Sequence, residues 1–145
     1  MKMLLSAVFV LATTLSGYGQ LWSDNYTDAQ QTAAETGKSV VVVFSGSDWC
    51  APCIKLEREI WSDATFQKDA AEQFVFYRAD FPRKKENSLP EELAAQNADL
   101  AERYNSRGSF PLVVILTPQG DVLGEAGYKK VSPAEYLQLL QGFAG

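Results

Sequence analysis

Two cysteines separated by two residues are the part of this chain whose residue types and spacing can do chemistry. Cys50 and Cys53 are the only cysteines among 145 residues, and Ala51 and Pro52 lie between them. Two thiols at this spacing can close a small, reversible disulfide when they stand between a strand and a helix. The apolar run 40–44, which precedes the cysteines with residues 45–49 between, predicts such a strand, covered on both faces. The pattern therefore predicts thiol–disulfide exchange, with a small structural loop as the alternative.

Other uses of a C-x-x-C motif fit this sequence less well. A tetrahedral zinc site needs about four Cys or His ligands, and this chain has two cysteines and no histidine. Haem attachment needs a histidine after the second cysteine, where Ile54 stands here. An iron–sulfur cluster would need ligands from a second chain, and Cu(I) delivery by the two thiolates stays open as an alternative. We predict redox chemistry without a bound metal, and the lack of histidine excludes Ser–His and Cys–His hydrolases.

The predicted helix gives the two thiols different roles. Pro52 fits the first turn of a helix, where no backbone N–H is needed. Cys50 then stands at the exposed helix N-terminus, where unpaired N–H groups and the macrodipole favour a thiolate. We predict that Cys50 is the nucleophile, with a pKa below the usual value of about 8.5. Cys53 shares the inward face of the helix with Leu56 and Ile60, and we predict that it is the resolving thiol.

The first residues have the pattern of a secretory signal peptide. A lysine precedes an apolar stretch at residues 4–15, and the small residues Gly17 and Gly19 follow it. The apolar stretch is shorter than the roughly 20 residues of a transmembrane helix. We predict that residues 1–19 are a signal peptide and that residues 20–145 form one exported domain, either periplasmic or extracellular. An uncleaved anchor is the alternative, and the net charge of −5 argues against a nucleic-acid partner.

Helix and strand patterns alternate along the rest of the chain and predict an α/β domain. Helices are expected at 27–36, from the cysteines to about residue 72 in two pieces, at 89–104 and from 133, after the capping box of Ser132 and Glu135. Strands are expected at 39–44, 74–79 and 112–116, followed by a hairpin through 118–123. Strand–helix–strand units predict parallel pairing, and the hairpin adds an antiparallel edge. The expected fold is a mixed central sheet with helices on both faces.

Two segments of the chain resemble the thioredoxin superfamily. Residues 44–53 read FSGSDWCAPC and are similar to the active-site strand and loop of its exported thioredoxin-like members. Residues 107–111 read RGSFP before an apolar strand and resemble the family's cis-proline loop. The resemblance extends over residues 22–143, and it implies a thioredoxin-like fold.

The resemblance also implies how a substrate is bound. The peptide bond before Pro111 would be cis, as is feasible for an X–Pro bond, and Pro111 would pack against the disulfide. The backbone of Phe110 would pair with an extended substrate segment. Trp49 would form an apolar wall beside the cysteines, and Gly127 would line the same groove. The alternatives are core packing for Trp49 and an ordinary trans turn for Pro111.

Two features depart from the family pattern. Thioredoxins carry a buried aspartate on the strand behind the second cysteine, where it assists proton transfer, and the matching position here is Val43. The segment 82–103 is longer than in compact thioredoxins, so it either shapes the choice of partner or merely decorates the fold. We expect the proton-transfer role at Val43 to be missing or supplied by another group.

The residues between the cysteines bear on the direction of electron flow. Ala51-Pro52 resembles the Gly-Pro of reducing thioredoxins, whereas oxidants and isomerases of the superfamily usually have histidine there. The resemblance implies an exported reductase of disulfides in client proteins, with its own Cys50–Cys53 disulfide as the redox group and no cofactor. Its electrons would come from a membrane-embedded thiol carrier, because the chain shows no NADPH site. The alternatives are a disulfide oxidase or isomerase, and a redox-silent binding or chaperone module.

Overall fold

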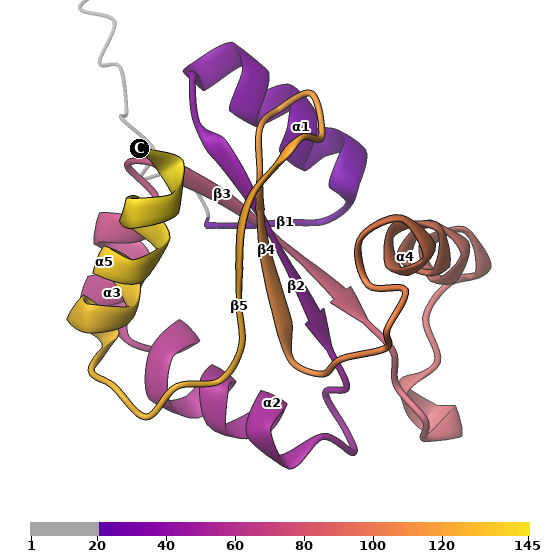
Figure 1. The fold of residues 1–145 in the computed structure, drawn as a ribbon. Helices are drawn as coiled ribbons and strands as arrows, with labels where there is room; N and C mark the ends of the chain where they lie inside the picture. Colours follow the sequence, from indigo (N-terminus) through magenta and orange to yellow (C-terminus); the bar gives the residue numbers. More distant parts are fainter. Residues whose placement is uncertain (1–20) are drawn as a thin grey trace, which may run out of the picture.

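A five-stranded sheet, in the order β1-β3-β2-β4-β5, forms the centre of the molecule (Figure 1). The computed structural model describes residues 21–145, so the predicted signal peptide lies outside the described residues. The strands are β1 (Trp22–Ser23), β2 (Ser39–Ser45), β3 (Phe74–Asp80), β4 (Leu112–Leu116) and β5 (Val122–Ala126). The helices are α1 (Tyr26–Thr36), α2 (Ala51–Leu56), the π turn η1 (Glu57–Trp61), α3 (Ala64–Ala70), the 3₁₀ turn η2 (Lys85–Asn87), α4 (Glu91–Tyr104) and α5 (Pro133–Ala144). No helix within residues 21–145 is both long and apolar enough to cross a membrane.

Strand β2 lies in the middle because its side chains are apolar on both faces. Val41 and Val43 point into a core shared with α2, η1, α3 and α5. Val40, Val42 and Phe44 point into a second core, which α1 and α4 cover. All five side chains are at most 1% exposed. The prediction of a mixed α/β sheet with helices on both faces is confirmed, and α2 is the helix that follows this buried strand after a short loop (Figure 1).

The direction of β4 differs from the expectation. Strands β2 and β3 are parallel, but β4 pairs with β2 in the antiparallel sense, so the second strand–helix–strand unit does not give parallel pairing. Figure 1 shows α4 nearly end-on, so this helix crosses the strands instead of running back along them. The Asn97 amide on α4 donates to the Asp80 carbonyl at 3.1 Å, which holds the helix near the carboxyl end of β3. The chain therefore re-enters the sheet from the end at which it left.

Several element boundaries also differ from the predicted ones. The short strand β1 was not expected, and it pairs in parallel with β3. Helix α1 is capped by Asn25, whose side chain accepts from the Asp28 N–H at 2.8 Å, so the helix begins one residue earlier than predicted. Helix α4 begins at Glu91, after Pro90, rather than at residue 89. The predicted capping box of Ser132 and Glu135 is present at the start of α5.

Candidate functional site

The two cysteines form a disulfide at the junction of β2 and α2. Their Cα atoms are 5.2 Å apart. Cys50 is the N-cap residue of α2, and its Sγ accepts from the Cys53 backbone N–H at 3.3 Å, while Pro52 occupies the first turn as predicted. Both cysteines are 4% exposed, so the expected contrast between an exposed Cys50 and an inward Cys53 is wrong. The closed disulfide turns the Cys50 side chain back onto the first turn of the helix.

In the loop before the cysteines, the Trp49 ring packs tightly against the backbone of Gly46. A Cβ atom added at Gly46 would lie 2.3 Å from the Trp49 ring, so only glycine allows the indole to lie there. The Trp49 Nε1–H donates to the Phe81 carbonyl at 2.7 Å. The ring centroids of Trp49 and Phe110 are 5.3 Å apart in an edge-on arrangement. Trp49 is thus half-buried and fixed between the cysteine loop and the loop that precedes β4.

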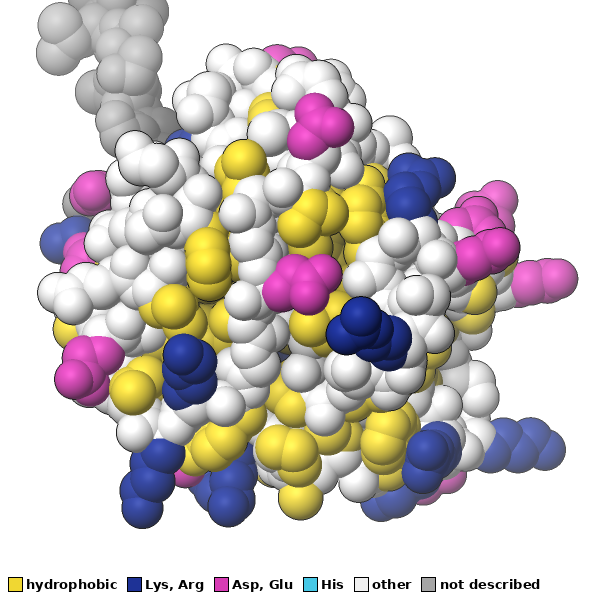
Figure 2. All heavy atoms as spheres, in the orientation of Figure 1, with side chains coloured by type: hydrophobic (Ala, Val, Ile, Leu, Met, Phe, Trp, Pro, Cys, Tyr) yellow, Lys and Arg dark blue, Asp and Glu magenta, His cyan; other side chains and the backbone are white. Residues whose placement is uncertain are grey.

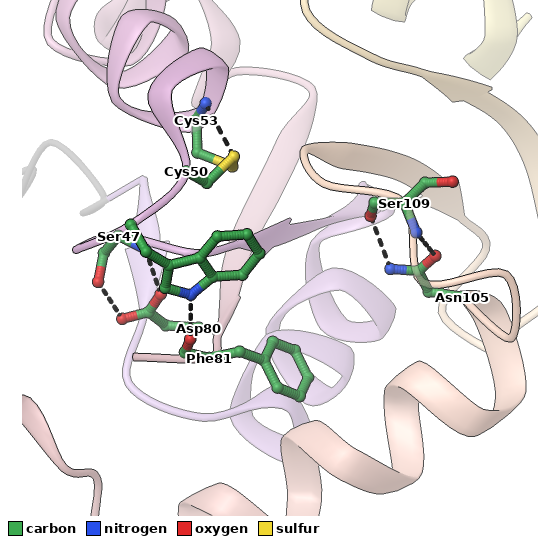
Figure 3. Close-up of a disulfide and its surroundings, with 8 residues drawn as sticks. Ser47, Cys50, Cys53, Asp80, Phe81, Asn105 and Ser109 are labelled. Carbon is green, nitrogen blue, oxygen red and sulfur yellow. Dashed lines mark hydrogen bonds between the residues drawn. A yellow bond between two sulfur atoms is a disulfide. The ribbon is translucent and has the colours of Figure 1, made fainter. Parts of the chain in front are cut away.

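Carboxylates attach the cysteine loop to the segment that follows β3. The Asp48 carboxylate accepts from the backbone N–H groups of Arg83 and Lys84, each at 2.9 Å, and from the Asn87 amide at 3.0 Å. These bonds hold the pKa of Asp48 below its usual value, and the N–H of Arg83 makes the largest contribution to that shift. Figure 3 shows a similar link in which Asp80 accepts from the Ser47 N–H at 2.9 Å and from its hydroxyl at 2.5 Å. Sequence reasoning missed both links.

The Phe110–Pro111 peptide bond is cis. Pro111 is buried, and it lines a cavity together with Cys53, so the structure brings the predicted proline to the disulfide. The loop before it is held by the buried side chain of Asn105, which bonds the Ser109 N–H and carbonyl at 2.9 Å each (Figure 3). Nothing in the sequence pattern had indicated this role for Asn105.

Gly127 also lies beside Pro111. A Cβ atom added at Gly127 would lie 3.7 Å from the Pro111 carbonyl oxygen, in ordinary contact. The Gly127 carbonyl accepts from the buried Tyr136 hydroxyl at 2.8 Å, which fixes this part of the chain to α5. The structure therefore gathers all the predicted site residues, Trp49, Cys50, Cys53, Phe110, Pro111 and Gly127, at one end of the sheet.

An ion pair that the sequence did not indicate stands behind Cys53. The Arg78 guanidinium on β3 pairs with the Glu57 carboxylate at the start of η1. Arg78 is the register partner of Val43, the position at which the family resemblance implies an aspartate. Cys53, Glu57, Arg78 and Val43 line the same cavity of about 130 Å³. The ion pair of Glu57 and Arg78 therefore lies close to Val43, the position that has no carboxylate in this chain.

The surface around the cysteines combines apolar and basic side chains. Figure 2 shows apolar side chains along the lower edge of the molecule, where α2 lies in Figure 1, with Lys and Arg side chains on either side. Ile54 on α2 is 44% exposed. Exposed cations near this end include Lys55, Arg83 and Lys84. Within residues 21–145, no three His, Cys, Asp or Glu side chains are grouped so as to hold a metal ion.

Comparisons with known proteins agree with this geometry. A sequence model of a family described as thioredoxin-like matches residues 21–118. The disulfide bond reductase DsbH of Chlamydia pneumoniae is 31% identical over 114 residues, which are 79% of this chain and 67% of that protein. A solved structure of a DsbH oxidoreductase superposes with a TM-score of 0.78 at 27% identity, covering 95% of this chain and 94% of the other. A thioredoxin from Thermus thermophilus shares the fold, with a TM-score of 0.63 at 23% identity over 86% of this chain and 87% of its own.

Proposed function

Because this chain belongs to the thioredoxin-like family and is a protein-disulfide oxidoreductase, we propose that it is an exported reductase of disulfides in client proteins. The observation that carries the proposal is the Cys50–Cys53 disulfide at the start of α2, beside the cis peptide bond of Pro111. The signal-peptide pattern of residues 1–19 supports an exported protein. A periplasmic location is the form of export that we propose.

The reduced protein begins the reaction with the Cys50 thiolate. It attacks one sulfur of the client disulfide, a Cys50–client bond forms, and the other client sulfur leaves with the electron pair and takes up a proton. The Cys53 thiolate then attacks the Cys50 sulfur and closes the Cys50–Cys53 disulfide, and the second client sulfur leaves as a thiolate. The client has gained two electrons, and the cysteine pair has lost two.

The groove beside the cysteines positions the client. We propose that the backbone of Phe110 pairs with an extended client segment. Pro111 and Gly127 line the groove beneath that segment. Trp49 forms the opposite apolar wall, where Arg83 and Phe110 hold its ring in place. The redox group is the protein's own cysteine pair, so no further cofactor is required for the exchange.

The residues between the cysteines support reduction rather than oxidation. Ala51 and Pro52 carry no charge and no histidine stands near Cys50, since the whole chain lacks histidine. A cationic neighbour that stabilised the Cys50 thiolate would make the pair more oxidising. We therefore expect a potential near the roughly −270 mV of thioredoxin rather than the roughly −180 mV of protein disulfide isomerase. The reductase name of the Chlamydia relative points in the same direction.

An exported reductase must be re-reduced by an electron donor. We propose a membrane-embedded thiol carrier, which would pass electrons to the Cys50–Cys53 disulfide by the same exchange chemistry. Trapping with Cys53→Ser in the native host tests this step, because the variant cannot resolve its mixed disulfides. A membrane protein captured through Cys50 supports the proposal, and capture of soluble clients alone contradicts it.

Two measurements test the reductase assignment. Equilibration of the cysteine pair with glutathione should give a potential near that of thioredoxin, and a value as oxidising as that of the isomerase would contradict the proposal. Insulin reduction in the presence of dithiothreitol should be accelerated by the protein and not by Cys50→Ser. A redox-silent binding module would give no acceleration with either protein.

A further inference from the structure

Cys53 and Glu57 both line one cavity. It measures about 130 Å³, and Cys53, Glu57, Val43 and Arg78 contribute to its wall, as does Pro111. A space of this size is large enough for several water molecules, and the polar groups of Glu57 and Arg78 can bind them. The cavity therefore offers a path along which a proton can move between Cys53 and Glu57.

The Arg78 guanidinium holds the Glu57 carboxylate in position by pairing with its Oε2 atom. The Ser62 hydroxyl lies 3.4 Å from Oε1, but it donates its proton to the Glu57 backbone carbonyl at 2.7 Å, so Arg78 is the partner that fixes the carboxylate. Arg78 is held in turn by the Trp22 ring, whose centroid lies 4.4 Å from the guanidinium carbon. The contacts from Trp22 to Arg78 and from Arg78 to Glu57 therefore limit the movement of the carboxylate.

The helix places Glu57 on the same side as Cys53. The Glu57 N–H donates to the carbonyls of Cys53 and Ile54, so the helix continues from Cys53 to Glu57. The side chains of Cys53 and Glu57 are four positions apart, and side chains at this spacing share one helix face. The π turn η1 begins at Glu57, and such turns are frequent at functional sites. Because the Glu57 side chain is 45% exposed, a proton that reaches it can pass on to solvent.

The chemistry of Cys53 requires such a group. Its side chain is buried, and burial disfavours the thiolate that must attack Cys50. The strand position behind it, Val43, has no group that can accept a proton. We propose that Glu57 accepts the Cys53 proton through water in this cavity, and so replaces the carboxylate that is missing at position 43. The inference rests on the proposed exchange between the two cysteines but not on the direction of electron flow.

The resolving step takes place in the mixed disulfide between Cys50 and the client. The Cys53 thiol gives its proton to the Glu57 carboxylate, and the resulting thiolate attacks the Cys50 sulfur. The Cys50–Cys53 bond forms, the bond from Cys50 to the client sulfur breaks, and that sulfur leaves with the electron pair. Glu57 then releases its proton to solvent, and the client thiolate takes up one from solvent.

Stopped-flow reaction of the reduced, full-length protein with excess 5,5′-dithiobis(2-nitrobenzoate) measures this step directly. The first thionitrobenzoate is released when Cys50 attacks the reagent, at a rate proportional to its concentration. The second is released when Cys53 attacks the mixed disulfide, at a rate independent of concentration. With Glu57→Gln, we expect the second phase to slow about 100-fold at pH 7, the lower end of the range for a positioned proton acceptor. The first phase should stay within about twofold, because Cys50 does not depend on this base.

Two matched variants and a pH series complete the test. Glu57→Asp keeps a carboxylate and should retain more of the second-phase rate than Glu57→Gln. Glu59→Gln removes an exposed carboxylate from the same turn. The Glu59 carboxylate accepts from the Tyr128 hydroxyl at 2.6 Å. This variant should leave the rates of both phases unchanged. The difference between wild type and Glu57→Gln should shrink as the pH rises, because hydroxide then removes the Cys53 proton directly.

The outcomes separate this inference from the proposed function. A second phase that is unchanged or faster in Glu57→Gln overturns the proton-transfer role, since loss of a negative charge alone would favour the thiolate. Equal slowing of both phases also overturns it, because the substitution would then have disturbed the whole site. A wild-type protein that releases no second thionitrobenzoate contradicts the cysteine exchange itself, and with it both proposals.

Discussion

The Asp48 carboxylate accepts the backbone N–H of Arg83 at 2.9 Å, and the Arg83 guanidinium lies 3.7 Å from the centre of the neighbouring Trp49 ring. The backbone of the loop after β3 is thereby attached to the cysteine loop. The Arg83 side chain of the same loop covers the Trp49 indole. The start of the long segment 82–103 therefore forms part of the active-site wall. We therefore propose that this segment contributes to the choice of partner rather than merely decorating the fold.

Loss of the Asp48 carboxylate should release this loop. Asp48→Ala removes the acceptor of three hydrogen bonds, from Arg83, Lys84 and Asn87. We expect trypsin to cleave after Arg83, Lys84 or Lys85 several-fold faster in the folded variant. Asp99→Ala removes an exposed carboxylate from α4 and serves as the control, with no change expected. Equal cleavage of all three proteins would show that Asp48 does not hold the loop.

Acid should release the same loop only at low pH. The pKa of Asp48 is lowered in the folded protein, chiefly by the hydrogen bond from the Arg83 N–H. Its contribution to stability is therefore fully present above the ordinary pKa of aspartate, and it is lost as the pH falls through the lowered value. Amide NMR shifts of Arg83 and Lys84 should stay constant from neutral pH down to the ordinary aspartate range and change only below it. A midpoint at or above the ordinary value would contradict the assignment.

Gly46 should tolerate no side chain. A methyl group at this position would overlap the Trp49 ring, so Gly46→Ala must displace the indole from the cysteine loop. We expect a loss of stability, a changed tryptophan fluorescence and slower disulfide exchange. Gly142→Ala is the matched control, because it lies in helix α5 with nothing within 4 Å of the added atom. That variant should be more stable by about 0.5–1 kcal/mol, with unchanged exchange.

The hydroxyl of Tyr136 should support the groove from beneath. It donates to the Gly127 carbonyl at 2.8 Å, and burial raises the pKa of the phenol, so the group stays neutral. Tyr136→Phe leaves that carbonyl without its partner and should lower the free energy of unfolding by about 1–3 kcal/mol. Urea unfolding measures the difference. Tyr128→Phe removes a hydroxyl that bonds the exposed Glu59 and should have a smaller effect.

The sequence predicted the parts of the site that are encoded locally. Cys50, Cys53 and Pro52 lie within four consecutive positions, and their spacing alone indicates a disulfide at a helix start. The buried strand before them is a continuous apolar run, and the helix start at Ser132 has its own capping residues. These features need no knowledge of the tertiary fold, because each depends on neighbours a few residues away.

The parts that the sequence did not reveal depend on contacts between distant residues. Asp48 and Arg83 are 35 residues apart, and an exposed-looking aspartate in a loop carries no sign of its partners. Glu57 and Arg78 come together only because β3 pairs beside β2 at Val43. The direction of β4 follows from the path of α4 across the sheet, which a helical pattern in the sequence does not specify.

Titration of the Cys50 thiol in a Cys53→Ser variant shows whether Cys50 is the nucleophile. We predict a pKa below the value of about 8.5 for free cysteine, because the helix N-terminus favours the thiolate. Absorbance of the thiolate and the rate of alkylation by iodoacetamide should give the same midpoint. An ordinary pKa, with alkylation no faster than that of free cysteine, would contradict the assignment of Cys50 as the nucleophile.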